Sequence, residues 1–543
     1  MSGFANQRNY RLNSRLMTRK RMDPADVVII GAGCGGAAFA WQIKRQAPHL
    51  KIVCLERGGW PDPTRMPAKS MRWQRAILED WASSPNLRLK SGAYRGSNDY
   101  AIDDGNSVFK PLMWNGVGGS TVAWAAHFPR LHPSDFRTRS LDGVGDDWPF
   151  DYFELEPWYD LNDEIMGVAG LNGDPAYPPK SSRAMPPLPF GAVANRAARA
   201  FSDLGWHWWP VDAAINSVAH DGRAACNNCG PCLIGCIPKA KASVDLTYWP
   251  KAIALGVELR TVVVARHIHI EAGLASGVTY ADRHGAEYFQ PAKAVVVAGN
   301  GIGTVRLLLA SGIDSPALGR NLMYHPAAYV RGLFKDRLDG PVGPVGCSIY
   351  SHEFYETDRA RGFERGIHLQ LSRENALAVQ ASRLQPLWGE AAQAQLREEF
   401  LHSMPILVLA EDLPEAHNRV SLTRAEEPDG LPGVKIDYIM AERARRSLDF
   451  GLARAEEVLL AAGAYRTIRV SPAPMTGWHL LGTARMGDDP RTSVTDPKGR
   501  CHRAPNVIVA DGSLFPTVGA VNPASTIGAV ALKLAAELGE DMA

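Results

Sequence analysis

A glycine-rich turn between two apolar strands near the N-terminus constrains this chain more than any other feature. Residues 26–30 read DVVII, a short β-branched run of the kind that forms a buried strand. The run ends at GAGCGG (31–36), and an alanine-rich stretch that is typical of a helix follows. A second apolar run, KIVCLE (51–56), predicts another strand. Together these segments predict a complete βαβ unit.

The spacing Gly31-x-Gly33-x-x-Gly36 gives each glycine a role. The first permits the tight turn, the second lets the backbone approach a pyrophosphate, and the third lets helix and strand pack closely. The phosphate then lies at the helix N-terminus, where free N–H groups point outward. Glu56 ends the second strand twenty residues after Gly36, where its carboxylate can accept hydrogen bonds from an adenosine ribose. The unit predicts a dinucleotide site rather than a ligand-free glycine turn, without separating FAD from NAD.

Three later segments favour FAD. WNGVGGSTVAW (114–124) ends a glycine run in Ser-Thr, so its N–H groups and hydroxyls can face an anion or a ring edge, although such a run can also be a plain loop. AVVVAGNGIGTVRLLL (294–309) predicts a buried strand, a glycine turn and an apolar helix. In VIVADGS (507–513) a strand ends in Asp511 and Gly512, which can place a carboxylate and an N–H against the ribityl and pyrophosphate end of a flavin nucleotide.

Half of the eight cysteines fall within the eleven residues CNNCGPCLIGC. Cys226, Cys229, Cys232 and Cys236 have the spacing C-x2-C-x2-C-x3-C, with proline two residues later, which is close to the ferredoxin run. Thiolates this close together on a loop can converge on one soft-metal centre. The pattern favours an iron–sulfur cluster. Structural zinc, which normally uses two separated pairs, and free or disulfide-bonded cysteines are the alternatives.

Bulk composition excludes several classes of partner. The formal net charge is only +2, which gives no reason to expect nucleic acid or an acidic membrane surface. No apolar run reaches the roughly 18 residues that span a bilayer, so we expect no transmembrane segment of its own. Residues 1–23 are basic without an apolar core, so we expect a flexible, solvated arm rather than a signal peptide. The other cysteines are far apart and demand no disulfide framework.

From about residue 24 to its C-terminus, the chain resembles the glucose–methanol–choline (GMC) flavoprotein oxidoreductases. It is most similar to the FAD and iron–sulfur subunits of the bacterial membrane-linked glucose, gluconate and fructose dehydrogenases, through GDDWP, MPPLP and the cysteine run. The GMC motifs are GAGCGG, LERG, NGVGGST, AGNGIGTVRLLL, GRNLMYHP, GWHLLGTARM, ADGS and VNPASTI.

The resemblance implies an α/β fold, α+β overall, in which a Rossmann-like FAD-binding domain is interleaved with a substrate domain on a mixed, mainly antiparallel sheet. Residues 24–130, 225–327 and 473–543, including the cysteine loop 226–238, then form the FAD domain. Residues 131–224 and 328–472 form the substrate-binding cap.

The resemblance also assigns site residues. His479 corresponds to the family's base and Asn522 to its second catalytic position, while His127, His325 and Trp124 line the pocket, pack, or touch the cofactor. Imidazole suits the role of base because it accepts and releases a proton near neutral pH. The FAD-binding residues are then Gly31, Gly33, Gly36, Glu56, Arg57, Gly118, Gly119, Ser120, Val263, Asp511, Gly512 and Asn522.

In the sugar dehydrogenases three cysteines spaced C-x5-C-x3-C hold a three-iron cluster. Cys226, Cys232 and Cys236 match that spacing, and Cys229 is additional. A 3Fe-4S cluster is therefore favoured, with Cys229 as a bystander or as the fourth ligand of a 4Fe-4S cluster. A one-electron centre beside a flavin implies that electrons leave singly to an external carrier, as in a dehydrogenase.

The implied function is oxidation of an alcohol group of a sugar, a glycoside or a related alcohol. Its implied partners are a small accessory subunit that carries the export signal and a cytochrome c acceptor, at the periplasmic side of the inner membrane, with a cytoplasmic location as the alternative. Other readings are an oxidase or dehydrogenase of an aryl or aliphatic alcohol, a GMC-fold lyase or photodecarboxylase, and a non-catalytic electron carrier. Glu411 and Asp412 could bind sugar hydroxyls or form a solvated acidic turn.

Overall fold

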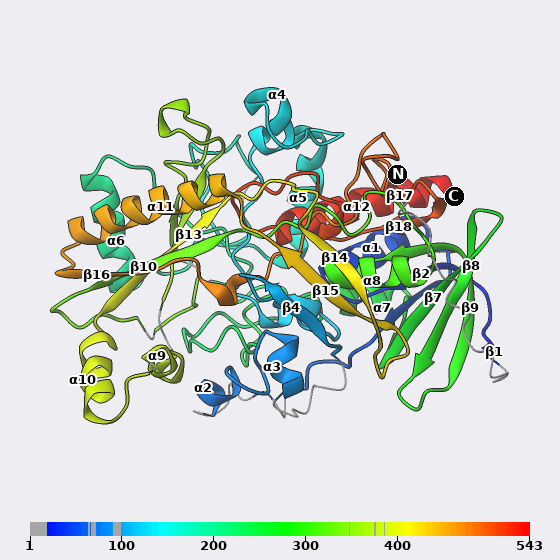
Figure 1. Cartoon of the computed structure of the whole chain (residues 1–543), viewed down its shortest axis with the longest axis horizontal. Helices are drawn as coiled ribbons and strands as arrows, with labels where there is room; N and C mark the ends of the chain where they lie inside the picture. The colour runs from blue at the N-terminus through cyan, green and yellow to red at the C-terminus, as the bar shows by residue number, and fades with distance from the viewer. Residues whose placement is uncertain are drawn as a thin grey trace, which may run out of the picture.

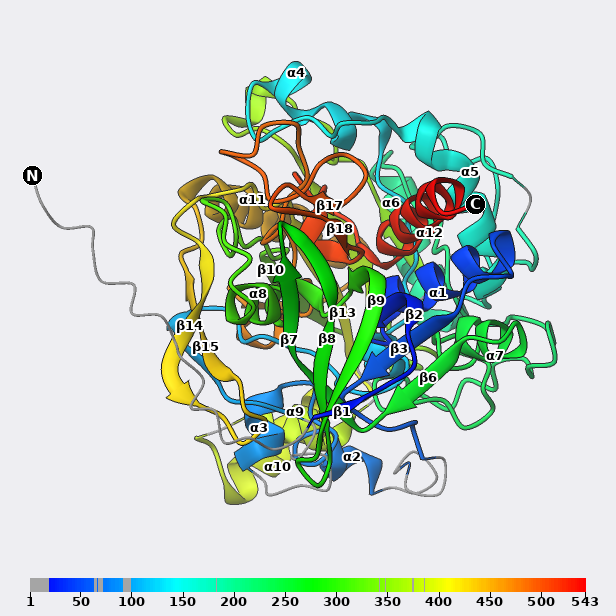
Figure 2. The ribbon, with the colours of Figure 1, turned by 90° about the vertical axis from the view of Figure 1, so that its right-hand side faces the viewer.

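A computed structural model describes residues 19–62, 66, 72–90, 99–181, 183–340, 342–346, 348–373, 376–384 and 386–543. Within these residues three β-sheets organise the chain, with helices packed around them (Figures 1 and 2). Cys347 and residues 1–18 of the expected N-terminal arm lie outside the described residues.

The largest sheet contains the predicted βαβ unit and has the order β17-β18-β9-β2-β3-β6, with β1, β7 and β8 attached to it. Its central strands β18, β9, β2, β3 and β6 pair in parallel. Its strands are β1 (Lys20–Arg21), β2 (Ala25–Ile30), β3 (Ile52–Glu56), β6 (Glu258–Thr261), β7 (Val263–Glu271), β8 (Leu274–Asp282), β9 (Glu287–Val297), β17 (Arg500–Cys501) and β18 (Ala504–Val509).

Helices cover this sheet and explain its unbroken apolar strands. Val27, Val28 and Ile29 are fully buried on both faces, as expected for a central parallel strand. Helix α1 (Cys34–Gln46) follows β2 and packs beside α12 (Ala524–Asp541), which ends the chain (Figure 2). Helix α8 (Asn300–Ala310) follows β9 in the same way. The predicted strand–turn–helix order is confirmed in both segments.

The second sheet has the order β16-β10-β13-β12-β11-β5, and all its pairings are antiparallel. Helix α11 (Glu442–Ala461) lies across β10 and β13 (Figure 1). The strands are β5 (Trp209–Pro210), β10 (Ala327–Leu333), β11 (Ile349–Ser351), β12 (Ile367–Leu371), β13 (Ser403–Ala410) and β16 (Arg466–Val470). The predicted fold class, a Rossmann-like sheet with a second, mainly antiparallel sheet, is confirmed.

A third sheet joins regions assigned to different domains. Strand β4 (Ile102–Ser107) pairs in parallel with β15 (Pro432–Tyr438), which pairs with β14 (Arg419–Glu426). The proposed domain boundaries stay a prediction. In the segment expected to be a flexible arm, Lys20 and Arg21 pair with Tyr288 and Phe289 of β9.

Shorter elements complete the described fold. The remaining α-helices are α2 (Trp73–Ala76), α3 (Pro85–Lys90), α4 (Thr138–Asp142), α5 (Tyr152–Met166), α6 (Gly191–Asp203), α7 (Tyr248–Ala254), α9 (Leu377–Arg383) and α10 (Gly389–Glu399). The 3-10 helices are η3 (Gly119–Ala123), η4 (Pro133–Arg137), η5 (Arg359–Arg361), η6 (Pro474–Thr476) and η7 (Gly512–Leu514). In the described part of the chain, we find no helix both long and apolar enough to cross a bilayer.

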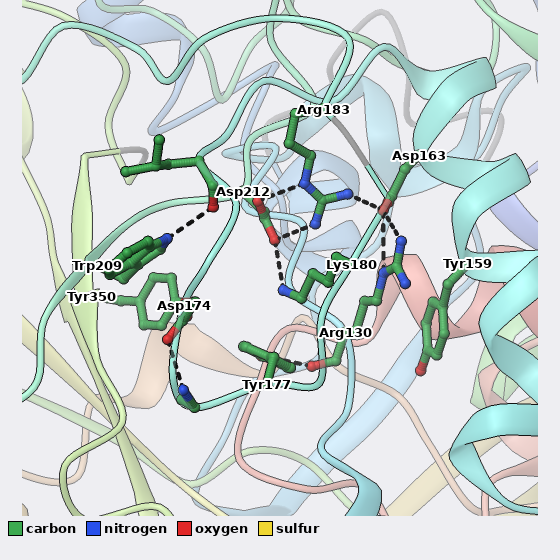
Figure 3. A network of polar contacts seen from close by, with 12 residues as sticks. Arg130, Tyr159, Asp163, Asp174, Tyr177, Lys180, Arg183, Trp209, Asp212 and Tyr350 are labelled. Atoms are coloured by element: carbon green, nitrogen blue, oxygen red, sulfur yellow. Dashed lines mark hydrogen bonds and ion pairs between the residues drawn. The ribbon is translucent and has the colours of Figure 1, made fainter.

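A buried ion network holds the segments around residues 130–212 together (Figure 3). The Arg130 guanidinium contacts Asp163, and Arg183 joins Asp163 to Asp212. Lys180 Nζ lies 3.0 Å from Asp212 Oδ2. Burial opposes the charge of Asp212, but these two cations hold the pKa of its carboxyl below its usual range. The Asp212 carboxylate therefore stays ionised at neutral pH.

The turn after β2 depends on backbone contacts that leave no room for side chains. A Cβ at Gly35 would lie 1.8 Å from the Ala510 carbonyl oxygen, and one at Gly36 would lie 2.0 Å from that of Gly31. Helix α1 can therefore approach the end of β18 and its own turn only because Gly35 and Gly36 have no Cβ atom.

We predict that Gly35→Ala destabilises the fold by at least about 2 kcal/mol, because the new methyl forces α1 away from Ala510. Thermal unfolding measures the effect, and the amount of flavin bound to each purified protein is recorded as well. Gly303→Ala is the matched control, since a Cβ there lies 3.6 Å from the Tyr100 hydroxyl and α8 gains helix propensity. Equal melting temperatures for Gly35→Ala and the wild type would refute the steric argument.

Candidate functional site

Two glycine loops meet at the N-terminus of α1. The Gly118 N–H donates to the Ala32 carbonyl at 3.0 Å, and a Cβ at Gly119 would lie 2.7 Å from the Gly33 Cα. Gly118 has φ +97°, which favours glycine. Helix α1 begins after Gly33 without a side-chain cap, as a helix end that receives an anion requires. The structure thus brings Gly31, Gly33 and Gly36 together with Gly118, Gly119 and Ser120.

Acidic side chains are fixed beside this turn. The Glu56 carboxylate accepts hydrogen bonds from the N–H groups of Ala32 and Gly58, both at 2.8 Å. Asp511 accepts from the Ser513 N–H at 2.9 Å and from the Thr304 hydroxyl at 2.6 Å. Burial raises the pKa of Asp511 above its ordinary value.

The remaining predicted cofactor residues lie at the edges of the same sheet. Arg57 pairs with Asp429 at 3.0 Å and covers the Tyr100 ring, while Val263 opens β7. At Gly512 a Cβ would lie 2.4 Å from the end of the Leu481 side chain, so the loop after β18 packs closely against that residue. Backbone that favours glycine at the carboxyl end of β2, where Gly31 has φ +105°, fits the pyrophosphate of FAD.

His479 and His325 form a buried pair with a defined tautomer. His325 Nε2 lies 3.0 Å from the Gly519 carbonyl oxygen, so this nitrogen carries the hydrogen and donates it. His325 Nδ1 must then accept, and His479 Nδ1 lies 2.8 Å away as the donor. The Nε2 atom of His479 is therefore left unprotonated, which is the state that a general base requires.

Burial keeps both rings neutral. It lowers the pKa of His479 well below 6.5, and His325 and His127 lower it further. Burial likewise lowers the pKa of His325 to about 4, against the carbonyls of Val518 and Gly519, which raise it. At neutral pH the His479 imidazole is therefore uncharged and able to accept a proton.

Asn522 belongs to the segment that holds this pair. It follows Val518 and Gly519, whose carbonyls contact His325. Among the residues that the structure describes, no group hydrogen-bonds to its buried Oδ1. An unpaired buried acceptor costs about 1–3 kcal/mol, so this atom points to a bound polar group. Asn522 therefore lies three residues after Gly519 in the segment whose carbonyls hold His325, the partner of His479.

The four clustered cysteines line one small recess together with Lys241 and Pro344. The Asn228 N–H donates to Cys226 Sγ at 3.4 Å, and the Lys241 N–H donates to Cys236 Sγ at 3.3 Å. Such N–H···S bonds are typical of iron–sulfur ligands.

The four thiols share this recess without forming one ligand group in this structure. Across the described residues, His, Cys, Asp and Glu side chains form no group of three that could hold a metal ion. Cys232 is buried, which raises the pKa of its thiol to about 12, whereas Cys229 is exposed. The donor set fits a soft-metal centre in chemistry, and the iron–sulfur cluster remains a proposal.

Lys241 joins the cysteine loop to the glycine loop. Its ammonium donates to the Cys232 carbonyl at 2.7 Å and to the carbonyls of Val122 and Trp124, both at 2.9 Å. Val122 lies in η3, which begins at Gly119. Two segments far apart in sequence are therefore tied by one buried cation.

The acidic pair Glu411 and Asp412 has a structural role that neither of its predicted readings described. Glu411 pairs with Arg365 at 2.7 Å. Asp412 accepts from the Tyr324 N–H at 3.0 Å and from the Tyr438 hydroxyl at 2.8 Å. Both side chains are buried, so the expected solvated turn is wrong, and a role in binding sugar hydroxyls stays a prediction.

Sequence reasoning missed a buried row of histidines, His132, His352 and His368, which hydrogen-bond to one another in the cap. His132 lies 220 residues from His352, and His352 lies 16 residues from His368, so no regular spacing marks the row. Their density, with fifteen histidines in the chain, was the only available hint.

Comparison with known proteins agrees with this geometry. Models of the family described as GMC oxidoreductase match residues 193–327 and 414–531. The chain is 37% identical to the 2-methyl-1,2-propanediol dehydrogenase of Mycolicibacterium austroafricanum, covering 94% of each chain. It is 29% identical to the fructose dehydrogenase large subunit of Gluconobacter japonicus, covering 95% of this chain and 98% of that one. The fold is similar to pyridoxine 4-oxidase from Mesorbium loti, with TM-score 0.65, 17% identity and coverage of 94% and 99%.

We predict that His325→Leu mixes the tautomers of His479, because Nδ1 of His479 loses its acceptor. His325→Gln is the conservative control, since its amide can donate to the Gly519 carbonyl and accept from His479. NMR of protein with 15N-labelled histidine measures the tautomer directly. The wild type and His325→Gln should show Nδ1–H at His479, unchanged through pH 6.5 because the pKa is lowered. An Nε2–H signal in the wild type would contradict the assignment.

Proposed function

The chain belongs to the GMC oxidoreductase family, and from that premise we propose that it is an FAD-dependent dehydrogenase that oxidises an alcohol group of a sugar, a glycoside or a related small alcohol. The observation that carries the proposal is the His325–His479 pair, which leaves one buried imidazole nitrogen unprotonated. A base of this kind serves to remove the proton of a hydroxyl group.

The chain's own residues supply binding and proton transfer. Bound FAD supplies the electron acceptor of the reaction. His479 Nε2 takes the hydroxyl proton, while the backbone carbonyl at Gly519 holds the pair in register through His325. The Asn522 side chain holds the substrate oxygen as the carbonyl forms. Fixing the hydroxyl between two groups is catalysis by positioning.

The printed names of the relatives support an alcohol as substrate. One acts on a branched diol and another on fructose, and both align with almost the whole chain. An aryl or aliphatic alcohol is the alternative substrate. A GMC-fold lyase or photodecarboxylase is less consistent with a cysteine loop tied to the glycine loop, because those reactions need no electron exit.

We predict that one class of alcohol bleaches the oxidised-flavin absorbance under anaerobic conditions, and that His479→Ala slows this bleaching by about 10²- to 10⁴-fold. The panel contains sugars, glycosides, diols, and aliphatic and aryl alcohols. His284→Ala, at an exposed position, is the control and should match the wild type. A folded, flavin-loaded protein that no alcohol bleaches would remove the dehydrogenase proposal and favour the lyase or carrier.

We also propose that the cysteine loop holds an iron–sulfur cluster, 3Fe-4S in preference to 4Fe-4S, which passes electrons to a cytochrome c. The shared recess and the N–H···S bonds support it. An accessory subunit with an export signal and a periplasmic place at the inner membrane belong to the same proposal, and the name of one relative, a large subunit, supports the existence of a further subunit.

We predict that Cys232→Ser abolishes bound iron and acid-labile sulfide, because this buried thiol is the ligand of the recess that solvent cannot replace. Cys229→Ser should keep a three-iron signal in electron paramagnetic resonance, since Cys229 is exposed. Cys501→Ala, a buried cysteine in β17, is the control for general effects of losing a thiol. Finding no bound iron in wild-type protein that was purified anaerobically would refute the proposed cluster.

A further inference from the structure

The peptide that joins Gly519 to Ala520 has a polar contact on each side. Its carbonyl oxygen lies 3.0 Å from His325 Nε2 and accepts the hydrogen of that nitrogen. Its N–H donates to the Tyr355 hydroxyl oxygen at 3.1 Å. In a trans peptide the C=O and N–H groups point in opposite directions. Tyr355 therefore fixes the orientation of the peptide whose carbonyl sets the tautomer of His325.

The tyrosine hydroxyl is itself held by a carboxylate. It donates to Asp135 Oδ2 at 2.7 Å. Burial raises the pKa of Tyr355 well above 10, so the hydroxyl keeps its hydrogen at neutral pH. With that hydrogen directed at Asp135, the Tyr355 oxygen has only lone pairs left for the Ala520 N–H, and it can only accept from this group. The direction of both hydrogen bonds is thus determined.

Hydrogen-bond donors surround the Asp135 carboxylate. Its Oδ2 atom also accepts from the backbone N–H of His132 at 2.7 Å, and its Oδ1 atom contacts the Arg365 guanidinium. Burial raises the pKa of this carboxyl, and the charge of Arg365 lowers it. Because the groups that hydrogen-bond to its two oxygens are donors, the Asp135 carboxylate is held as an acceptor.

Close packing holds the tyrosine ring and the peptide against each other. The Tyr355 ring stacks on the His132 imidazole with the ring centroids 3.8 Å apart, and only 1% of Tyr355 is exposed. Gly519 has φ +59°, which favours glycine. A Cβ at this position would lie 2.7 Å from Asp135 Oδ2 and 2.7 Å from the Tyr355 hydroxyl oxygen. The backbone can approach both side chains because residue 519 has none of its own.

A second contact ties the same segment to Asp135. The Thr517 hydroxyl donates to the Asp135 carbonyl oxygen at 3.1 Å, and the Trp148 indole N–H donates to the Thr517 hydroxyl oxygen at 3.0 Å. Asp135 thus contacts the segment once directly and once through Tyr355. The backbone is therefore anchored on both sides of the two carbonyls that contact His325.

We propose that Asp135 and Tyr355 are positioning residues that select the proton-accepting tautomer of His479, a role in catalysis that rests on the function proposed above. The hydrogen bonds form one unbroken chain, whose members in order are Asp135, Tyr355, the Gly519–Ala520 peptide, His325 and His479. The two positioning residues act on the base through the peptide and through His325, not by contact with the reacting atoms.

The opposite orientation of the peptide would inactivate the base. With the peptide turned over, the Ala520 N–H would face His325 Nε2, which would then have to accept. The hydrogen of His325 would lie on Nδ1 and would be donated to His479 Nδ1. The hydrogen of His479 would then lie on Nε2, where it prevents this nitrogen from taking the proton of an alcohol.

The tyrosine opposes this orientation. A turned peptide would direct the Gly519 carbonyl oxygen at the Tyr355 oxygen, whose hydrogen is already donated to Asp135. Two acceptors would then face each other in a buried place, without a hydrogen between them. The Val518 carbonyl, 3.3 Å from His325 Nε2, favours the active tautomer more weakly. Loss of the Tyr355 hydroxyl should therefore mix the two tautomers rather than exchange one completely for the other.

The test removes the hydroxyl and measures the tautomer of the base. Tyr355→Phe deletes one oxygen and keeps the ring. In holoenzyme with 15N-labelled histidine, NMR should show Nδ1–H alone at His479 in the wild type, and a mixture of Nδ1–H and Nε2–H in Tyr355→Phe. Tyr248→Phe is the matched control, because the buried Tyr248 hydroxyl in α7 donates to Asn162 Oδ1, also at 2.7 Å. This control should keep the wild-type tautomer.

The rate of anaerobic flavin bleaching gives a second readout, with the alcohol that bleaches the wild type. Tyr355→Phe should lower the maximal rate about 3- to 10-fold, the effect of one buried hydrogen bond on the balance between tautomers. The alcohol concentration that gives half of the maximal rate should not change, because no group that touches the substrate is removed. Both tyrosine variants lose a buried hydroxyl, so a merely structural role would affect them alike.

The wild-type tautomer of His479 in Tyr355→Phe would overturn the proposed positioning, and a mixed tautomer with an unchanged bleaching rate would overturn its role in catalysis. If no alcohol bleaches the wild type, the proposed function fails, while a mixed tautomer in Tyr355→Phe still supports the selection of the tautomer. If Tyr355→Phe does not fold, the wild type decides. Hydrogen on His325 Nε2 then supports the orientation of the peptide, and hydrogen on His325 Nδ1 refutes it.

Discussion

Close backbone contact at the start of α1 is the constraint on which the site depends. The absence of a side chain at Gly35 and Gly36 lets the helix lie against the Ala510 and Gly31 carbonyls. The Gly119 backbone then packs on Gly33 from a second loop. Backbone N–H groups are the donors that a pyrophosphate needs, and only glycine lets this much backbone converge. The fold and the cofactor site are therefore specified by the same few positions.

Much of this region could be predicted from the sequence because its signals are local. The strand–turn–helix order of 26–56 and 294–309 follows from apolar runs broken by glycine, and Glu56 is placed by its position at a strand end. The second sheet was inferred only through family resemblance. Its strand β12 reads IHLQL, an alternation of apolar and polar residues that predicts one solvent-facing side, yet the strand is buried throughout.

The histidine row and the roles of Glu411 and Asp412 could not be predicted, for a different reason. His132 precedes η4, His352 follows β11 and His368 lies in β12, so their contact exists only after the sheet has formed. The local sequence around Glu411 and Asp412 predicts only two charged residues in a turn. Their partners Arg365 and Tyr438 lie 46 and 26 residues away. The role of a buried polar residue depends on its hydrogen-bond partners, which no local sequence pattern reveals.

Lys241 ties the cysteine loop to the glycine loop. Its ammonium holds carbonyls of Val122 and Trp124 beside the glycine loop, and the carbonyl of Cys232 in the cysteine loop. Its own N–H contacts Cys236 Sγ. A buried cation with carbonyl partners on both sides is costly to release, since each lost bond leaves a desolvated charge less satisfied. Lys241 therefore helps to fix the separation of the glycine loop and the cysteine loop.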